Sequence, residues 1–203
     1  TFECEVEGER FKVCVHRNGS FDVEWLDCPS ENVPSGYSAG SSGGVVIPDD
    51  KNIMRLDDEC FQDNTKITKV VLPTTLMEIS EYAFKGCTNL EEIVIPAKCT
   101  VINNYAFKDC TSLKKIKLLE SEDKVNGDKS TGALTVGRNC FEGCVNLTTI
   151  ENPSRLTTAY DYAFKGCTAL ETMDINGLRI AGKYVFDGCT KLKTVITDAD
   201  TPL

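Results

Sequence analysis

Apolar positions along the chain recur with a period of 23 residues. A phenylalanine marks each repeat, a leucine or isoleucine follows six residues later, and a further apolar residue follows nine residues later. The marker residues are Phe61, Phe84, Phe107, Phe141, Phe164 and Phe186. Their spacings are 23, 23, 34, 23 and 22 residues, so one repeat carries eleven extra residues. A fixed period of this length indicates stacked units that share one core, because a single unit cannot bury its own apolar face.

The end of each repeat predicts a β-strand. In the third repeat, Ile116 and Leu118 flank Lys117, the alternation of a strand with one buried face. Stacking predicts a right-handed solenoid with a parallel sheet of about seven strands. The residues eight and ten after each phenylalanine should then line its concave face and contact a partner. They are Lys69, Val71, Glu92, Val94, Lys115, Lys117, Thr149, Glu151, Thr172, Asp174, Thr194 and Ile196.

The segment around each phenylalanine predicts a tight return with about one helical turn. Asp57, Ser80 and Asn103 lie four residues before their phenylalanine, where they suit a helix N-cap. A glycine often follows two residues after the phenylalanine, as Gly86 does, and suits the left-handed conformation that ends a helix. The fold class expected is therefore an α/β repeat solenoid of the leucine-rich type.

Eleven cysteines change this picture little, because most follow the repeat. Five lie three residues after the phenylalanine, namely Cys87, Cys110, Cys144, Cys167 and Cys189. They could form a disulfide or metal ladder, or a stack of buried, reduced thiols. We favour thiols, because neighbouring coils hold these side chains parallel and Asn64 fills the same position in the first repeat. A bridge among Cys4, Cys14 and Cys28 stays open.

Residues 1–28 lack the repeat and predict a small antiparallel sheet. We expect Val6 to pair with Phe11, and Val15 with Phe21, which places the apolar residues on one face. The predicted organisation is an N-terminal antiparallel β cap and linker over 1–44, followed by the solenoid over 45–203. The extra residues lie near 120–132, as a binding loop or a tolerated excursion, and we favour the excursion.

Charge and histidine content exclude several functions. The net charge is −9, which argues against nucleic acid or an anionic membrane as the main partner. No apolar run reaches the ~18–20 residues that span a bilayer. His16 is the only histidine, which excludes metal sites with two histidine ligands. We expect no catalytic residue, metal or cofactor. The chain starts at Thr1 without a visible secretory signal, and we expect one to have been removed.

The unit Ala-Phe-x-Gly-Cys-Thr-x-Leu-x-x-Ile-x-Ile-Pro resembles the BspA-like leucine-rich repeat proteins. The resemblance covers roughly Val45 to Thr197 and extends to the opening hairpin from Phe2 to Val15. It implies an extracellular or cell-surface protein that binds host or bacterial proteins without catalysis. The family has no ligand motif, so the resemblance names no particular partner.

Two functions therefore remain. The first is an adhesin-like protein-interaction module, and the alternative is an architectural spacer within a larger surface protein. A second surface competes with the concave face for a partner. It is a stripe of tyrosines two residues before the phenylalanine, on the convex side, consisting of Tyr82, Tyr105, Tyr162 and Tyr184. We favour the concave face, because a tyrosine repeated in a tight turn is more often a packing residue.

Overall fold

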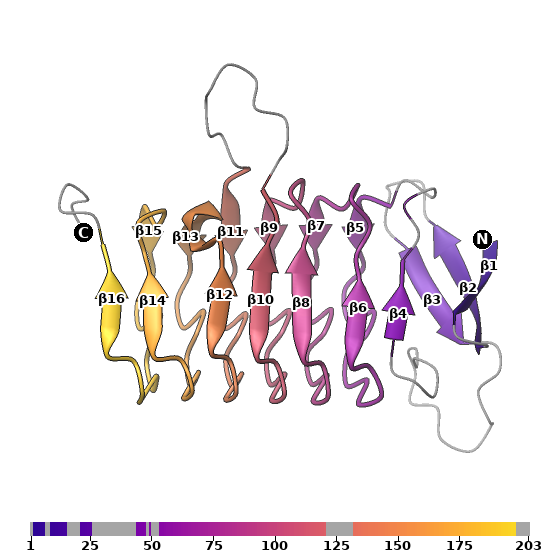
Figure 1. Ribbon diagram of the computed structural model, residues 1–203. Coiled ribbons are helices and arrows are strands. Elements are labelled where there is room, and N and C mark those ends of the chain that lie inside the picture. The colour runs from indigo at the N-terminus through magenta and orange to yellow at the C-terminus, as the bar shows by residue number, and fades with distance from the viewer. Residues whose placement is uncertain are drawn as a thin grey trace.

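A computed structural model describes residues 2–6, 9–15, 21–25, 44–47, 49, 53–120 and 132–197, and for the strands before residue 47 it describes the backbone alone. Successive coils stack side by side into an elongated solenoid, with the N-terminal strands at one end and β16 (Thr194–Ile196) at the other (Figure 1). The predicted solenoid with parallel strands is confirmed.

One row of parallel strands runs along the front of the solenoid in Figure 1. Its strands are β4 (Gly44–Val46), β6 (Lys69–Val71), β8 (Glu92–Ile95), β10 (Lys115–Leu118), β12 (Thr149–Glu151), β14 (Thr172–Asp174) and β16. The first five form one sheet, and β14 pairs with β16 separately. Ile116 pairs with Ile93 on one side and Ile150 on the other, so equivalent residues of the repeat lie in register.

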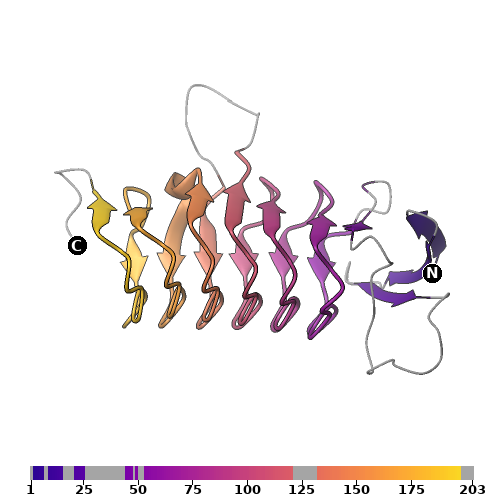
Figure 2. The same cartoon turned by 60° about the horizontal axis from the view of Figure 1, so that its bottom comes forward.

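A second parallel sheet, which the sequence did not predict, runs along the back of the solenoid (Figure 2). It consists of β5 (Arg55–Leu56), β7 (Glu78–Ile79), β9 (Val101–Ile102), β11 (Leu134–Val136), β13 (Leu156–Ala159) and β15 (Ile180–Ala181). Most of its strands have only two or three residues, too few for an alternating pattern to be recognised. Pairing with the adjacent coils, rather than local sequence, therefore defines these strands.

The expected α/β class is wrong, because the described residues contain almost no helix. A short 3-10 turn, η2 (Pro153–Arg155), lies between β12 and β13. The phenylalanine segments are successive tight turns. The amide of Phe84 donates to the carbonyl of Ala106 in the next coil at 2.7 Å, while the amide of Lys85 donates to the carbonyl of Tyr82 within the turn at 3.0 Å. Amides that alternate between coils in this way cannot form the i to i−4 bonds of a helix.

The expected N-cap residues have other partners. The hydroxyl of Ser80 is buried and accepts a hydrogen bond from Nε of Arg55 at 2.8 Å. The side-chain amide of Asn103 donates to Oε1 of Glu78 at 2.7 Å. Both bonds join neighbouring coils across the back sheet. These residues therefore hold the stack together and do not begin a helix.

The left-handed conformation predicted for the glycine after each phenylalanine is present. Gly86 has a φ of 72°, and a Cβ at this position would clash with a carboxylate oxygen of Asp63. The residue two before the phenylalanine is also left-handed, which the sequence did not indicate. Tyr82 and Tyr105 have φ values of 57° and 59°, a conformation that bulky residues rarely adopt.

The N-terminal strands pair antiparallel in the order β1 (Phe2–Val6), β2 (Glu9–Val15) and β3 (Phe21–Trp25). The β2–β3 register places Val15 opposite Phe21, as the sequence predicts. The β1–β2 register differs by two residues, with Cys4 opposite Phe11 and Val6 opposite Glu9. A shift of two keeps the same residues on each face, because side chains alternate with a period of two. A capping role for this sheet stays a prediction.

Phenylalanine rings stack through the core from coil to coil. The rings of Phe84 and Phe107 have centroids 5.0 Å apart and an interplanar angle of 8°. Each of the rings from Phe61 to Phe164 is almost fully buried. The last ring, Phe186, stacks on one neighbour only at 5.7 Å and is partly buried. This continuous stack makes each coil depend on the coils beside it.

The repeat cysteines form a second ladder beside the rings. Each thiol donates to the carbonyl of the phenylalanine one coil earlier, as Cys110 does to Phe84 at 3.1 Å. All five are buried, as predicted, and none of the eight cysteines with described side chains forms a disulfide. Asn64 fills the same position, and its side-chain Oδ1 accepts a hydrogen bond from the backbone amide of Lys66 at 3.0 Å. The side chains of Cys4, Cys14 and Cys28 lie outside the described residues.

Thiol burial predicts a loss of stability in alkali. Desolvation raises the pKa of Cys87 and Cys99 from 9.0 to about 12. Between pH 9 and 12 the unfolded chain loses thiol protons that the folded chain keeps, so the free energy of unfolding falls as pH rises. The slope is up to about 1.4 kcal/mol per pH unit for each thiol.

Urea unfolding from pH 8 to 11 measures how the free energy of unfolding changes with pH. The Cys87→Ala/Cys99→Ala variant should show a shallower slope. Equal slopes in both proteins would contradict this account.

Candidate binding surface

The twelve residues predicted to contact a partner lie together on the outer face of the front strands, which we call the β-face. Each of them is exposed or half-buried, whereas four of the six residues between them are buried, namely Val70, Ile93, Ile116 and Met173. Toward the C-terminal end Ile150 is half-buried and Val195 is exposed. Strand alternation therefore gave the correct outward positions. The contact with a partner itself stays a prediction.

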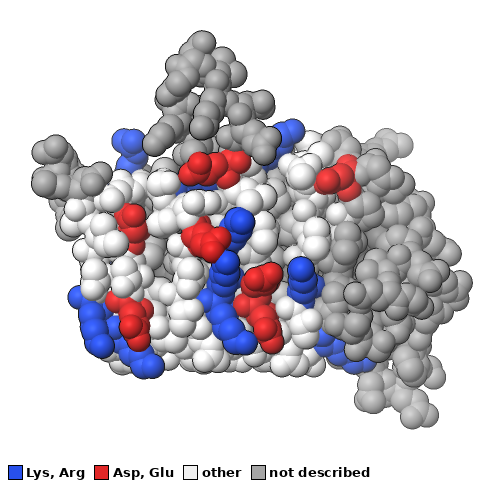
Figure 3. Space-filling model, in the orientation of Figure 1, with Lys and Arg blue, Asp and Glu red and all other residues white. Residues whose placement is uncertain are grey.

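Charges on the β-face alternate along one row of residues across β6, β8 and β10. Glu92 lies opposite Lys69 on one side and Lys115 on the other. Nζ of Lys115 forms an ion pair with Oε1 of Glu151 at 2.5 Å. Their hydrogen bond raises the pKa of Lys115 and lowers that of Glu151. Figure 3 shows this face, where basic and acidic side chains lie beside one another over the middle of the strand row.

A hollow of about 310 Å³ interrupts the β-face at the ends of β6 and β8. Val71 and Val94 contribute to its apolar floor, and Pro96 and Leu119 form part of its wall. Val71 is 43% exposed. Sequence reasoning missed the hollow, because its lining comes from three different coils and includes residues beyond the strand ends.

A buried arginine supports the wall of this hollow from inside. Arg155 is fully buried, and Nη1 donates to the carbonyls of Leu119 at 2.7 Å and Pro96 at 3.2 Å. Its other donors bond three more carbonyls, those of Gly132 at 3.0 Å, Ala97 at 3.1 Å and Cys99 at 2.6 Å. No carboxylate among the described residues pairs with it. Leu119 and Gly132 flank the extra residues of the long repeat, so Arg155 fixes both ends of that insertion.

Comparison with known proteins identifies this architecture. The model of the BspA type leucine rich repeat region matches residues 41–131 and 128–201, with six copies. The chain belongs to the BspA-type leucine-rich repeat family. A search of curated proteins found none that matches it. No helix among the described residues of this leucine-rich repeat chain is long and apolar enough to cross a membrane.

Three solved structures share the leucine-rich repeat fold. A leucine rich cell surface protein from Faecalibacterium prausnitzii is 20% identical, with a TM-score of 0.54 over 98% of this chain and 55% of its own. The T. pallidum leucine rich repeat protein is 22% identical, with a TM-score of 0.54 over 90% of this chain and 88% of its own. A leucine-rich repeat protein from Eubacterium ventriosum is 24% identical, with a TM-score of 0.52 over 81% and 46%. This chain thus spans about half the length of the first and third.

The competing tyrosine stripe is divided in this leucine-rich repeat chain. Tyr82 stacks on Tyr105 at 5.0 Å, and Tyr162 on Tyr184 at 5.3 Å, with Asn139 in the coil between the pairs. Three lysines extend over the rings, as Lys108 does over Tyr105 at 5.8 Å. Apart from Tyr184, which is 64% exposed, the rings are half-buried. Their contacts within the repeats favour a packing role over a binding role.

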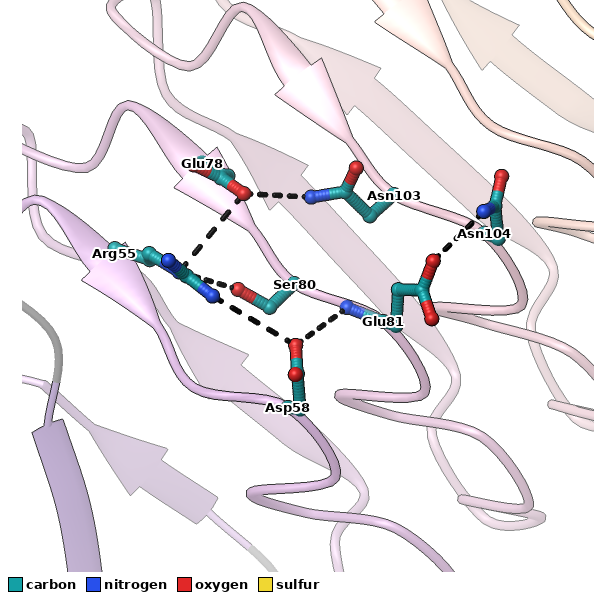
Figure 4. Close-up of polar contacts among 7 residues, drawn as sticks. All are labelled: Arg55, Asp58, Glu78, Ser80, Glu81, Asn103 and Asn104. Carbon is teal, nitrogen blue, oxygen red and sulfur yellow. Dashed lines mark hydrogen bonds and ion pairs between the residues drawn. The ribbon is translucent and has the colours of Figure 1, made fainter.

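A polar network on the back sheet also belongs to the leucine-rich repeat scaffold (Figure 4). It consists of Arg55, Asp58, Glu78, Ser80, Glu81, Asn103 and Asn104. Most of its bonds join one coil to the next, as Asn104 does to Glu81 at 2.8 Å. Among the described residues, no three His, Cys, Asp or Glu side chains gather as a metal site would require. The network therefore satisfies polar groups between coils and offers no chemistry of its own.

Proposed function

We propose that this chain is a non-catalytic protein-interaction module of a secreted or cell-surface protein, adhesin-like, with the β-face as its binding surface. The observation that carries the proposal is the hollow at Val71 and Val94, since exposed apolar residues next to charges are common at protein-binding surfaces. Leucine-rich repeat proteins generally bind proteins. The similar fold of the Faecalibacterium prausnitzii cell surface protein supports a cell-surface location for this chain. Catalysis has no support, because the described cysteines are buried and His16 is the only histidine.

An architectural spacer is the second candidate. It is favoured by the networks that join coil to coil, because they give the solenoid rigidity without reserving side chains for a partner. Glu142 is an example of a side chain whose partners all lie within the solenoid. It contacts Lys108 at 2.8 Å, Lys165 at 3.4 Å and Asn139 at 2.9 Å. A spacer would show no specific binding through either the β-face or the tyrosines.

Binding to a panel of purified matrix proteins (collagen, fibronectin and laminin) separates these candidates. The Lys115→Glu/Lys117→Glu variant reverses two charges on the β-face, and we expect it to weaken binding at least tenfold. The Lys191→Glu/Lys193→Glu variant makes the same charge change on exposed residues before β16 and should bind like the unaltered protein. Surface plasmon resonance measures each affinity.

A variant of the tyrosine stripe tests the competing surface. If the β-face variant binds normally while a folded Tyr105→Ala protein does not, the β-face assignment is wrong and the tyrosine stripe is the binding surface. If no variant changes the affinity for any matrix protein, the spacer function is favoured. Far-ultraviolet circular dichroism of each variant verifies that the solenoid is intact.

A further inference from the structure

We infer that the hollow on the β-face binds an extended polypeptide segment in which an apolar side chain is followed closely by a carboxylate. This inference rests on the proposed function and specifies the chemistry of the partner. The apolar side chain would contact Val71 and Val94, and the carboxylate would lie toward Lys117 on β10. The size, charge and rigidity of the hollow each support this occupant.

The hollow has the dimensions of a side-chain pocket. Its volume of about 310 Å³ is at the lower end of the ~300–1,000 Å³ that ligand pockets occupy, so it suits one or two side chains rather than a folded surface. Val71 is 43% exposed although its strand, β6, pairs with a strand on each side. An apolar side chain placed on it would remove that surface from water, which favours binding.

Local charge favours a carboxylate. Neither Lys69 nor Lys117 forms an ion pair within the part of the chain that the structure describes, whereas Lys115 is paired with Glu151. Lys117 lies opposite Val94 in the strand register, beside the apolar floor. Glu92 lies between Lys69 and Lys115 in one row, and Glu151 lies opposite Lys117 in the next, so the three lysines exceed the two glutamates by one positive charge. This local excess of positive charge contrasts with the net charge of −9 for the whole chain.

The wall of the hollow is held in place before any partner arrives. The carbonyls of Pro96 and Leu119 both accept from the same nitrogen of Arg155. Because this guanidinium is fully buried and bonds five carbonyls, the two wall residues cannot separate without breaking its hydrogen bonds. A preformed wall lowers the entropic cost of binding a flexible segment. The hollow is therefore suited to a partner that is itself unfolded or extended.

Two pools of synthetic hexapeptides test the inference. Both place leucine, valine or phenylalanine at the second position, and they differ at the fourth position, which is aspartate or glutamate in one pool and lysine in the other. Fluorescence anisotropy measures binding to the full chain. We expect the acidic pool to bind at least tenfold more tightly than the basic pool. Val71→Asp and Lys117→Glu should each weaken it at least tenfold, and Lys193→Glu should leave it unchanged.

The outcomes distinguish this inference from the function on which it rests. Equal binding of the two pools, or acidic binding that survives both Val71→Asp and Lys117→Glu, would overturn the inference. Failure of the acidic pool to bind, while matrix binding still depends on Lys115 and Lys117, would overturn it and leave the proposed function intact. Because Val71 and Lys117 lie on the outer face, one variant can replace the other if either fails to fold.

Discussion

Replacing Arg155 with leucine is expected to lower the free energy of unfolding by about 3–5 kcal/mol, the cost of breaking a buried charged network. The substitution leaves five backbone carbonyls without the donors that now satisfy them. The bonds to Pro96 and Cys99 are buried and the other three are partly buried, and leucine offers no hydrogen bond, so the buried carbonyls remain desolvated and unpaired. Urea unfolding followed by circular dichroism measures the change.

Two further variants define the origin of this loss. Arg155→Lys keeps the charge but has one nitrogen in place of three, so it should recover only part of the stability. Arg138→Leu removes an arginine whose side chain is 63% exposed and paired with Asp161 at 3.6 Å, and it should change stability by less than about 1 kcal/mol. If Arg155→Leu lowered the free energy of unfolding by no more than Arg138→Leu does, the hydrogen bonds from Arg155 to the carbonyls would not contribute to stability.

Phe107→Ala should cost about 3–5 kcal/mol, the range for removing a large buried aromatic side chain. Phe107 is fully buried and stacks on Phe84 at 5.0 Å and on Phe141 at 5.2 Å. Its removal opens a cavity in the middle of the ladder and breaks two ring contacts at once. Adjacent coils cannot close this cavity, because their strands are fixed in register on both sides. Thermal and urea unfolding give the size of the effect.

The matched control is Phe186→Ala, at the last position of the same ladder. Phe186 is only partly buried and has one stacking neighbour, Phe164, at 5.7 Å. We expect its removal to cost clearly less than that of Phe107. A similar cost at both positions would show that the stack contributes little beyond the local burial of each ring.

The outward residues of the β-face and the buried cysteines could be predicted from sequence. Both follow from the position of a residue within the repeat. Lys115 and Lys117 alternate with buried neighbours in one strand, and Cys110 keeps a fixed distance from Phe107. Equivalent positions stack on one another in every coil, so one pattern, repeated six times, specifies the same environment six times.

The helical turn predicted around each phenylalanine was wrong, because the sequence of one repeat does not show the hydrogen bonds to the next coil. Ser80 and Gly86 have the spacing of a helix start and a helix end, and nothing in one repeat reveals that the amide of Phe84 bonds Ala106 in the next coil. The left-handed tyrosines were equally hidden, because their strained backbone is maintained by neighbouring coils. Short strands of the back sheet, such as β7, also depend on neighbouring coils, because β7 is defined by its pairing with β5 and β9.

The sequence by itself determined the repeat, the stacked coils and the direction of the side chains on the front strands. These features depend on the 23-residue period of the apolar positions, which can be read directly from the sequence. Only the tertiary structure decided the role of Arg155, which lies 59 residues from Pro96 and 36 from Leu119 and stands where other repeats have Thr75 and Lys98. It also decided the hollow, whose lining comes from three coils. Periodicity encodes contacts between equivalent positions, whereas these features join positions that are not equivalent.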